Sequence, residues 1–475
     1  MFINRHQELA ALNRMFQSGI AELFVLYGRR RVGKTELLLQ FCKDKRSIYF
    51  TASQLKEGDH LRQLTETARH VINDPLLQSL VFDDWESALI YFAQQAQKER
   101  LVLVLDEFQY LCDDNAALPS LIQRFWDLHG KNSKLFLILC GSQVSFMERE
   151  VLAERSPLYG RRTGQFQLMP LSYRDSGHFF PEYAAKEKLI AYGILGGIPA
   201  YLNRFALHSL DISRDIPQKI FERHITTELL TPQGYLFDEV NFLLRMELRE
   251  PRTYASLLHV IAGGATRSNE ISQRVGLRPT DTGKYLSVLR ELRLIKRETP
   301  ITERAPQKSK KGLYKIADNY VKFWFRFVLP NRSLIESGNA DLVYEEMITP
   351  NLSHYMGEIF EDICRQYISL YWGEKLKDAP KRVGAHWGSS LEIDVLTENV
   401  DGSHWFGECK WWDAPVGENI LNRLIENATK VPDRWKQNPR YVLFSANGFT
   451  DALRQRAEKE EVFLVDTNDL FFPVY

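Results

Sequence analysis

One short pattern near the start of the chain limits its fold more than any other feature. Residues 28–35 read Gly-Arg-Arg-Arg-Val-Gly-Lys-Thr and directly follow the apolar run Leu23–Leu26. Glycines at this spacing let the backbone curl until its N–H groups face a chain of phosphates, and a helix that begins at the lysine adds the positive end of its dipole. The pattern therefore predicts a strand, a phosphate loop and a helix in direct succession.

Each residue of this pattern has an expected role in binding a nucleoside triphosphate. Lys34 reaches the β- and γ-phosphates, and the Thr35 hydroxyl is offered to Mg²⁺. Four fixed positions in eight residues can also match by chance, but the strand before the loop and the helical sequence Glu36–Phe41 after it argue against that. The residues that we expect to contact the nucleotide here are Gly28, Arg29, Arg30, Arg31, Val32, Gly33, Lys34, Thr35 and Glu36.

A second motif, about seventy residues further on, supports the first. The apolar run Leu101–Leu105 ends in Asp106 and Glu107. An uninterrupted Val and Leu run suits a central parallel strand, and such sheets bind ligands at the carboxyl ends of their strands. We expect Asp106 to hold Mg²⁺ and Glu107 to orient or deprotonate the attacking water. The alternative, a solvated turn after a strand, is disfavoured by the phosphate loop upstream.

Two further groups suit a hydrolytic site. The apolar strand 134–140 is followed by Ser142 and Gln143, either of which is a candidate γ-phosphate sensor, the alternative being an ordinary turn. Arg161 and Arg162 follow a glycine, and either could serve as an arginine finger, in cis or from a neighbouring subunit. The alternative for this arginine pair is plain surface charge.

Composition limits the class of protein. A chain of 475 residues with 44% hydrophobic content is long enough for two to four globular domains. The start lacks the apolar segment of a signal peptide, and no run is long enough to span a bilayer, so we expect a cytoplasmic protein without membrane contact. The net charge is zero, so nucleic-acid binding would need a local basic patch. Neither metal-ligand spacing nor a disulfide framework links the cysteines, which are Cys42, Cys112, Cys140, Cys364 and Cys409.

Such a basic patch lies in the middle of the chain. Residues 252–311 hold thirteen Lys or Arg against five Asp or Glu. Helical segments at 254–261, 268–275 and 280–292 are separated by glycine turns and followed by a hairpin-like stretch, which outlines a winged helix-turn-helix. We expect DNA contacts from the third helix and the wing, at Arg278, Thr280, Thr282, Lys284, Lys308, Lys310 and Lys311. The alternative is a three-helix spacer that contacts other proteins.

The last third of the chain carries a weaker pattern. Asp394 lies on one expected strand and Glu408 and Lys410 on the next, joined by a turn at Asp401-Gly402. Because side chains alternate along a strand, Glu408 and Lys410 share a face. Such a group can hold Mg²⁺ and position a water for phosphodiester hydrolysis, with Glu361 from an upstream helix as a further acid. A solvated hairpin face is the alternative on spacing alone.

Taken together, these segments resemble the archaeal-type P-loop ATPases related to the STAND and AAA+ groups. The resemblance rests on 2–9, the phosphate loop, Leu105–Gln109, Leu158–Arg162 and the Gly-Gly-Ile-Pro sequence at 196–199. In the tail, Gly357-x-x-Phe360-Glu361, Glu392-Ile-Asp394, Glu408-x-Lys410 and 443–445 resemble the PD-(D/E)xK nuclease-like domain that many members carry. The stretch 384–387 departs from the family pattern of a basic residue before paired aromatics, and we expect it to pack differently.

The resemblance implies a multi-domain α/β fold. Its parts are a P-loop ATPase core with a parallel sheet at 1–175, a helical lid or linker at 176–248, a winged helix-turn-helix at 249–320 and a restriction-endonuclease-like domain at 321–475. It implies ATP and Mg²⁺ as cofactors, and it assigns Asp394, Glu408 and Lys410 to a nuclease site with the two carboxylates as metal ligands. Glu361 is the expected helix acid, and Glu358 is its rival.

We therefore expect an ATP-hydrolysing switch. Nucleotide binding between subunits or lobes would order the Arg161-Arg162 region and the sequence at 196–199, and would control whether the C-terminal domain engages DNA, with Mg²⁺-dependent cleavage as a further activity. A homo-oligomer fits this scheme. The competing hypothesis is a STAND-like signalling ATPase whose winged helix and tail are non-catalytic interaction modules, and a third is a defence or mobile-element protein that DNA triggers.

Overall fold

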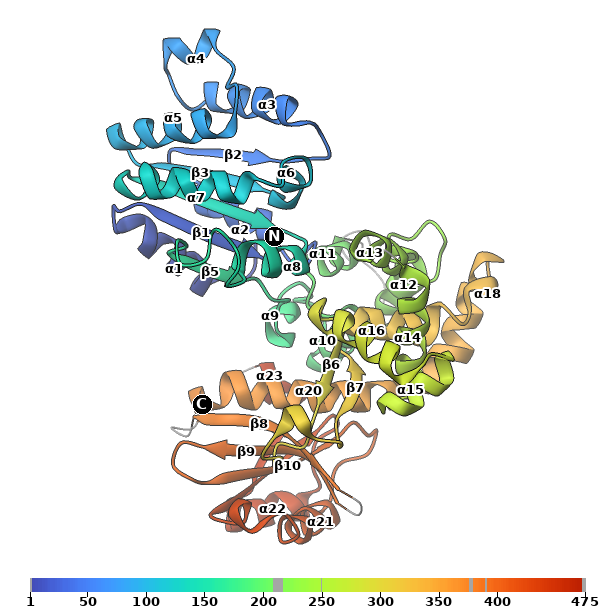
Figure 1. Ribbon diagram of the computed structural model, residues 1–475. Helices are drawn as coiled ribbons and strands as arrows, with labels where there is room; N and C mark the ends of the chain where they lie inside the picture. Colours follow the sequence, from blue (N-terminus) through green and yellow to red (C-terminus); the bar gives the residue numbers. More distant parts are fainter. Residues whose placement is uncertain (1, 208–216, 249, 376–378, 389–390, 472–475) are drawn as a thin grey trace. The chain divides into compact units, whose positions relative to one another are not determined.

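The computed structural model describes residues 2–207, 217–248, 250–375, 379–388 and 391–471 (Figure 1). The chain forms two compact units. Unit 1 consists of residues 1–170 and 198–200, and unit 2 consists of residues 171–197 and 201–475. The finer boundaries expected near 175, 248 and 320 stay predictions.

Unit 1 is built on a five-stranded sheet in which every pair of neighbours is parallel. The strand order is β2-β3-β4-β1-β5. The strands are β1 (Glu22–Tyr27), β2 (Ser47–Thr51), β3 (Leu101–Asp106), β4 (Leu135–Gly141) and β5 (Gly164–Gln167). Residues of β1, β3 and β4 are buried throughout, as expected for unbroken apolar strands that are covered on both faces. The expected parallel sheet is confirmed.

Helices cover both faces of this sheet (Figure 1). On one face, Phe92, Phe108 and Ile122 belong to a single core that includes alternate residues of β1, β3 and β4. On the other face, Phe41 packs edge-on against Phe136 of β4. The helices of this unit include α1 (His6–Gln17), α2 (Lys34–Cys42), α3 (Glu57–Arg69), α4 (Pro75–Ser79), α5 (Trp85–Lys98), α6 (Phe108–Asp114) and α7 (Leu118–Leu128).

Unit 2 begins with helices, as expected for 176–248. They are α9 (Tyr173–Gly177), α10 (Ala185–Leu195), α11 (Pro199–Leu207, which starts in unit 1), α12 (Pro217–Leu229) and α13 (Glu239–Glu247). Residues 208–216 of the predicted helical segment lie outside the described residues. Tyr201, near the centre of this segment, is buried and donates a hydrogen bond to Glu239 at 3.0 Å.

Three helices and a hairpin follow in the order that the sequence predicted. The helices are α14 (Pro251–Ala262), α15 (Ser268–Val275) and α16 (Pro279–Glu291), and the antiparallel strands are β6 (Ile295–Glu298) and β7 (Leu313–Ile316). Gly276 ends α15 in the left-handed conformation at φ 74°, which glycine adopts without strain. Proline at the first position of α14 and of α16 sets where these helices start.

The C-terminal part of unit 2 holds a second sheet, in the order β12-β11-β10-β9-β8. Its strands are β8 (Pro380–Trp387), β9 (Glu392–Asn399), β10 (His404–Lys410), β11 (Pro439–Ser445) and β12 (Phe463–Asp466), and the long helix α20 (Thr349–Lys375) contacts β8, β9 and β10. Strands β9 and β10 form the expected antiparallel hairpin. The stretch 384–387, which we expected only to pack differently, belongs to the edge strand β8, where the Ala385 carbonyl accepts a hydrogen bond from the Ile301 N–H at 2.9 Å.

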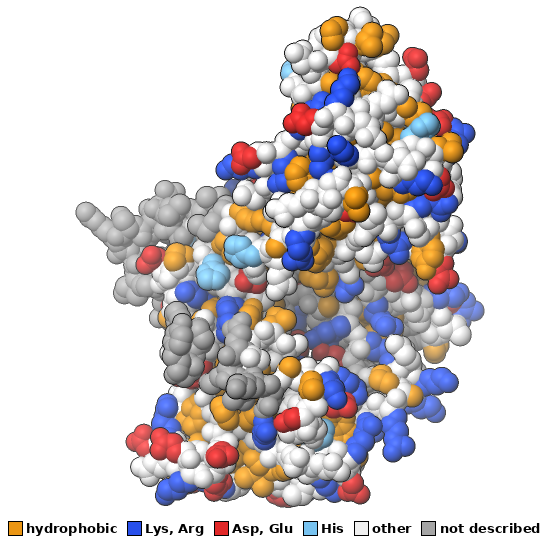
Figure 2. Space-filling model, turned by 90° about the vertical axis from the view of Figure 1, so that its left-hand side faces the viewer, with side chains coloured by type: hydrophobic (Ala, Val, Ile, Leu, Met, Phe, Trp, Pro, Cys, Tyr) orange, Lys and Arg blue, Asp and Glu red, His pale blue; other side chains and the backbone are white. Residues whose placement is uncertain are grey.

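The surface charges and the cysteines can be compared with what the composition indicated. Figure 2 shows Lys and Arg side chains interspersed with Asp and Glu over the face that it draws, so this face carries no field of a single sign. All five cysteines lie among the described residues, and all are buried and free of disulfides. None of the helices in the described parts of the chain combines the length and the apolar content that a bilayer crossing demands.

Candidate active site

The parallel sheet of unit 1 brings the two nucleotide motifs to one edge. Strand β4 lies between β1 and β3, and all three run in the same direction. The phosphate loop leaves the carboxyl end of β1, Asp106 ends β3, and Ser142 follows β4. Segments that are far apart in sequence therefore converge at the edge where ligands of parallel sheets bind.

Two positions of the loop favour glycine, each for a different reason. Gly33 has φ 96°, in the left-handed region, immediately before α2 begins at Lys34. A Cβ atom on Gly28 would lie 2.4 Å from the main-chain oxygen of Leu168. The loop therefore needs both glycines, one for its turn and one for the close approach of the next chain segment.

Lys34 is folded back into its own loop. Its Nζ donates hydrogen bonds to the main-chain oxygens of Gly28 at 2.9 Å and Arg29 at 3.0 Å. The side chain is buried, and burial lowers the pKa of Lys34 despite the opposing charges of Asp106 and Glu107. Phosphate oxygens can replace these two carbonyls, because both kinds of group accept hydrogen bonds and the phosphates add negative charge.

Other loop residues differ in their surroundings. Arg30 donates a hydrogen bond to the Tyr110 hydroxyl at 2.7 Å. Val32 is fully buried, which anchors the loop in the core. Thr35 and Glu36 are exposed at the start of α2, where a bound ligand can reach them.

Asp106 is held by several donors at once. Its Oδ2 accepts hydrogen bonds from the Thr35 hydroxyl at 3.1 Å and from the Tyr49 hydroxyl at 2.7 Å. Its Oδ1 accepts the Glu107 N–H at 2.9 Å. Burial, and then the charge of this carboxylate, raise the pKa of the buried Cys140 thiol well above its usual value. Thr35 and Asp106 thus present adjoining hard oxygen atoms, the ligand type that Mg²⁺ prefers.

Glu107 occupies a strained position beside Asp106. Its φ is 54°, in the left-handed region that residues with a Cβ rarely adopt. Its Oε2 accepts hydrogen bonds from Ser142 and from Gln109, both at 2.5 Å. Gln109 also donates to the Ser142 hydroxyl at 3.2 Å. Ser142 therefore lies directly against the residue expected to activate water, and Gln109, to which sequence reasoning gave no role, completes the contact.

The two candidate finger arginines are bound within unit 1. Arg161 donates to both carboxylate oxygens of Asp127, with Nε to Oδ1 at 3.1 Å and Nη2 to Oδ2 at 2.9 Å. This pairing holds the pKa of Asp127 below its usual value. Arg162 donates to the main-chain oxygen of Leu152 at 3.1 Å. In this structure, both guanidinium groups are therefore used by other partners.

A second cluster of acidic residues lies in unit 2, on the C-terminal sheet. Gly407 pairs with Val395 across β9 and β10, which places Asp394 opposite Glu408. Asp394 is buried, and its Oδ2 accepts the Cys409 N–H at 2.8 Å. Lys410 donates to Glu408 at 2.6 Å, so these two side chains share a strand face as predicted.

Glu361 of α20 completes this cluster, and Glu358 does not. Burial, and then the charge of Asp394, raise the pKa of Glu361 to about 8. Burial and Asp394 likewise raise the pKa of Glu408. Glu358, in contrast, forms an ion pair with Lys322 at 2.5 Å. Among the described residues, no three His, Cys, Asp or Glu side chains are arranged to hold a metal ion.

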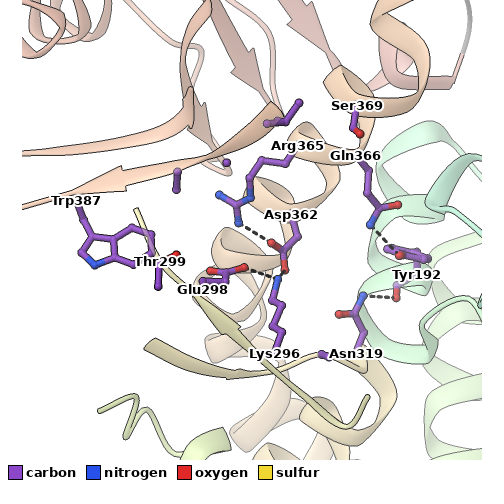
Figure 3. A pocket seen from close by; sticks show the side chains of 14 residues that line it. Tyr192, Lys296, Glu298, Thr299, Asn319, Asp362, Arg365, Gln366, Ser369 and Trp387 are labelled. Carbon is purple, nitrogen blue, oxygen red and sulfur yellow. Dashed lines mark hydrogen bonds and ion pairs between the residues drawn. The ribbon is translucent and has the colours of Figure 1, made fainter. Parts of the chain in front are cut away.

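Next to this cluster lies a polar pocket of about 440 Å³ (Figure 3). Lys296 of β6 bonds to Asp362 at 2.7 Å and to Glu298 at 2.6 Å, and Arg365 bonds to Asp362 at 2.5 Å. The pKa of Asp362 lies well below its usual value because Lys296 and Arg365 outweigh the effect of burial. Arg365 also donates to the main-chain oxygen of Asp394 at 2.8 Å. Sequence reasoning missed this network, whose members come from β6 and α20.

The residues expected to contact DNA are only partly accessible. Thr282 is fully buried and donates to the main-chain oxygen of Arg278 at 3.1 Å, so the expectation that it contacts DNA is wrong. Arg278 and Lys284 are exposed, and each forms an ion pair with Asp281. In the expected wing, Lys311 pairs with Glu303 at 2.8 Å.

Comparisons with known proteins agree with this arrangement. Residues 2–205 match a family described as an ATPase domain predominantly from Archaea. Residues 324–423 match a family of archaeal and bacterial proteins of unknown function. An uncharacterised protein of Methanocaldococcus jannaschii is 37% identical over 415 residues, which cover 87% of this chain and 88% of that protein.

One solved structure shares the fold, and a second is only distantly similar. The Walker-type ATPase PABY2304 of Pyrococcus abyssi has a TM-score of 0.53 and 23% identity, covering 68% of this chain and 96% of that chain. A signal-transduction ATPase with numerous domains, with a tetratricopeptide repeat sensor, from Pyrococcus horikoshii has a TM-score of 0.33 and 14% identity, covering 78% of this chain and 51% of that chain. The first shows a shared fold, and the similarity of the second is too low to support an argument.

Proposed function

Because this chain belongs to the family whose ATPase domain is found predominantly in Archaea, we propose that it is a Mg²⁺-dependent ATPase that works as a nucleotide-controlled switch. The observation that carries this proposal is the convergence of four groups at one edge of the sheet. Lys34 and Thr35 come from the phosphate loop, Asp106 ends β3, and Glu107 lies beside Ser142. These are the parts that phosphoryl transfer to water requires.

In the proposed reaction, the phosphates displace the two main-chain carbonyls from Lys34, which then balances their charge. Glu107 accepts a proton from the attacking water, whose oxygen forms a bond to the γ-phosphorus as the bond to the β,γ-bridging oxygen breaks. ADP and phosphate leave. Both described hydrogen bonds to the Glu107 carboxylate use Oε2, so we assign Oε1 to the water. Thr35 and Asp106 would hold Mg²⁺, which supplies positive charge at the β- and γ-phosphates.

We further propose that nucleotide state is passed to unit 2 through the Gly-Gly-Ile-Pro sequence at 196–199. The chain passes here from unit 2 to unit 1 and back. Pro199 lies beside the phosphate loop, because a Cβ on Gly33 would be 3.8 Å from its Cγ. Gly197 is tightly enclosed, since a Cβ there would lie 2.0 Å from the Leu171 oxygen. A change in the loop can therefore displace Pro199, and residue 197 must stay glycine.

DNA is the proposed partner of unit 2. The order α14, α15, α16, β6, β7 supports a winged helix-turn-helix, and the side chains of Arg278, just before α16, and Lys284, within it, are exposed. The PD-(D/E)xK resemblance of the tail makes Mg²⁺-dependent cleavage the proposed activity of Asp394, Glu408 and Lys410. One observation favours the competing view of a non-catalytic interaction module: Lys410 is already paired with Glu408 at 2.6 Å.

Steady-state ATP hydrolysis tests the first part of this proposal. Lys34→Ala and Glu107→Gln should each reduce turnover by at least about a hundredfold, because they remove charge balance and proton acceptance respectively. Glu107→Gln should keep nucleotide binding. Unchanged turnover in both variants would refute the proposed ATPase.

Cleavage of labelled linear, nicked and single-stranded DNA tests the tail. The assay uses Mg²⁺ or Mn²⁺, with and without ATP, and compares the wild type with Asp394→Ala and Lys410→Ala. Cutting that depends on ATP and is lost in both variants supports a gated nuclease. The absence of cutting with intact ATP hydrolysis favours the interaction module.

A further inference from the structure

Tyr49 is a polar side chain of the nucleotide site that neither the motifs nor the family resemblance indicated. It lies in β2, the neighbour of β3, where Thr51 pairs with Asp106. Residues 48 and 50 point into the core and are buried, while Tyr49 lies on the other face and is half-buried. The alternation along β2 therefore places the Tyr49 side chain on the same face of the sheet as Thr51 and its partner Asp106.

The contact between Tyr49 and Asp106 is short and directed. Their oxygen atoms are 2.7 Å apart, closer than the 3.1 Å between Thr35 and the same oxygen of Asp106. A hydroxyl that donates to a carboxylate forms one of the stronger hydrogen bonds in proteins. Each carboxylate oxygen offers about two lone pairs, so Thr35 and Tyr49 together use those of Oδ2, while Oδ1, which accepts the Glu107 N–H, retains capacity for a cation.

This contact has a consequence for metal binding. Carboxylate groups rotate over a broad range about their last torsion unless their oxygens are held. The Glu107 N–H holds Oδ1 at 2.9 Å, and Tyr49 provides the shortest contact to Oδ2. Without the phenol, Thr35 would be left to hold Oδ2 and also to serve the cation. The phenol itself is a neutral donor, so it restrains the carboxylate without cancelling its charge.

We propose that Tyr49 is a positioning residue for the magnesium site, and that its phenol fixes Asp106 in the orientation that serves Mg²⁺ beside Thr35. This inference rests on the proposed function, because it assigns Tyr49 to the same site. Tyr49 does not touch the nucleotide in this role. It sets the concentration of divalent cation at which the site works.

The test is Tyr49→Phe, which removes one oxygen and keeps the ring. The Mg²⁺ concentration for half-maximal ATP hydrolysis should rise about tenfold, the change expected from loss of one hydrogen bond to a charged group. Affinity for a fluorescent ATP analogue in EDTA should stay unchanged. A merely structural role for Tyr49 would instead weaken nucleotide binding in EDTA as well, and this outcome would overturn the proposal.

The chain offers a matched control. Tyr91 of α5 donates to the carboxylate of Asp74 at 2.9 Å, in the same unit and with the same chemistry. Tyr91→Phe should leave the Mg²⁺ dependence unchanged. An equal shift in both variants would show a general effect of lost phenols and would also overturn the proposal.

Two further measurements keep the test independent of hydrolysis. Tightening of the ATP analogue by added Mg²⁺ can be followed in the Glu107→Gln background, so Tyr49 can be assessed even if the wild type turns over no ATP. In a double-mutant cycle, Tyr49→Phe should have no effect on the Mg²⁺ dependence once Asp106 is alanine. An undiminished effect in that background, or an unchanged Mg²⁺ dependence of Tyr49→Phe itself, would contradict the proposed route through Asp106.

Discussion

The nucleotide site of unit 1 and the acidic cluster of unit 2 differ in what holds their charged groups. In unit 1, the described hydrogen bonds of Lys34 go to main-chain carbonyls, and those of Asp106 come from hydroxyls and an N–H. In unit 2, Asp394 accepts a main-chain N–H, but other carboxylates face cations of the protein itself. Glu408 is paired with Lys410, and Asp362 is paired with Lys296 and Arg365. The first site holds its charges with neutral groups, and the second holds these two carboxylates with opposite charges.

This difference indicates which site is ready for a charged ligand. A lysine held by neutral carbonyls keeps its charge available for phosphates, and a carboxylate held by neutral donors keeps its charge available for a cation. A carboxylate already paired with lysine must lose that partner before it serves a metal. The contrast therefore predicts that substitutions of equivalent residues act differently in the two units.

The largest expected effect contrasts the two lysines. Lys34→Met should lower ATP turnover by at least about a hundredfold, because Lys34 is the residue expected to reach the β- and γ-phosphates and methionine removes its charge there. Lys410→Met should leave ATP turnover unchanged, since its described partner is Glu408. ATP hydrolysis of both variants under saturating Mg²⁺ checks this contrast, and similar losses in the two would abolish the distinction between the sites.

The next effect concerns the stability of the charged network. Asp362→Ala should destabilise unit 2 by about 2 to 3 kcal/mol, because it leaves Lys296 and Arg365 half-buried with one partner fewer. Urea unfolding followed by tryptophan fluorescence measures the change. Glu426→Ala, which breaks the exposed pair between Glu426 and Lys430, is the control and should have no measurable effect. Equal free energies of unfolding for the wild type and Asp362→Ala would show that the network does not stabilise unit 2.

A third effect depends on pH. The pKa of Glu361 is raised to about 8, so the folded protein binds a proton that the unfolded chain has already released near pH 5. The free energy of folding that Glu361 gains from this proton is fully present below about pH 4.5, and it is lost as the pH rises to about 8. Glu361→Gln should therefore raise the melting temperature at pH 9 by a few degrees, corresponding to about 1 to 2 kcal/mol, and by almost nothing at pH 5.

Differential scanning fluorimetry in EDTA checks this prediction. A melting-temperature difference that is the same at both pH values would contradict it. Added Mn²⁺ sharpens the comparison between the two units. If the cluster takes a metal, the wild type gains stability at pH 9 and Glu361→Gln does not.

Local patterns in the sequence were enough to predict which segments meet at the proposed nucleotide site, because its main residues lie in short consecutive motifs. Residues 28–35 and Asp106-Glu107 could be assigned to strand ends from apolar runs alone, and the sheet then brings them together. Tyr49 could not be found this way, since it lies 57 residues from Asp106 and on a strand without a recognisable motif. Only the pairing of β2 with β3 brings the two together.

The acidic cluster was partly predictable for a similar reason. Asp394, Glu408 and Lys410 lie on one hairpin, whose strands and turn have local signals. Arg365 lies one helical turn after Glu361, a spacing that could have suggested an ion pair. Lys296 is 66 residues from Asp362, and edge strand β8 has no clear alternation, so neither could be placed without the tertiary fold.

The smallest expected effect concerns Arg161. This residue of unit 1 is paired with an opposite charge, Asp127, as the carboxylates Glu408 and Asp362 of unit 2 are. Its guanidinium makes three hydrogen bonds to the carboxylate of Asp127 and also donates to the main-chain oxygens of Pro157 at 3.1 Å and Tyr159 at 3.3 Å. Because its charge is already balanced, Arg161→Ala should change ATP turnover by less than about threefold, whereas a working arginine finger is worth about a thousandfold or more. Asp127→Ala should match it, since each variant breaks the same half-buried ion pair. Turnover measured over a range of protein concentrations checks both variants and includes any contribution from a neighbouring subunit. A thousandfold loss in Arg161→Ala alone would mean that ATP binding releases the arginine from Asp127. An ion pair seen in this structure would then not exclude either charged group from catalysis, in unit 1 or in unit 2.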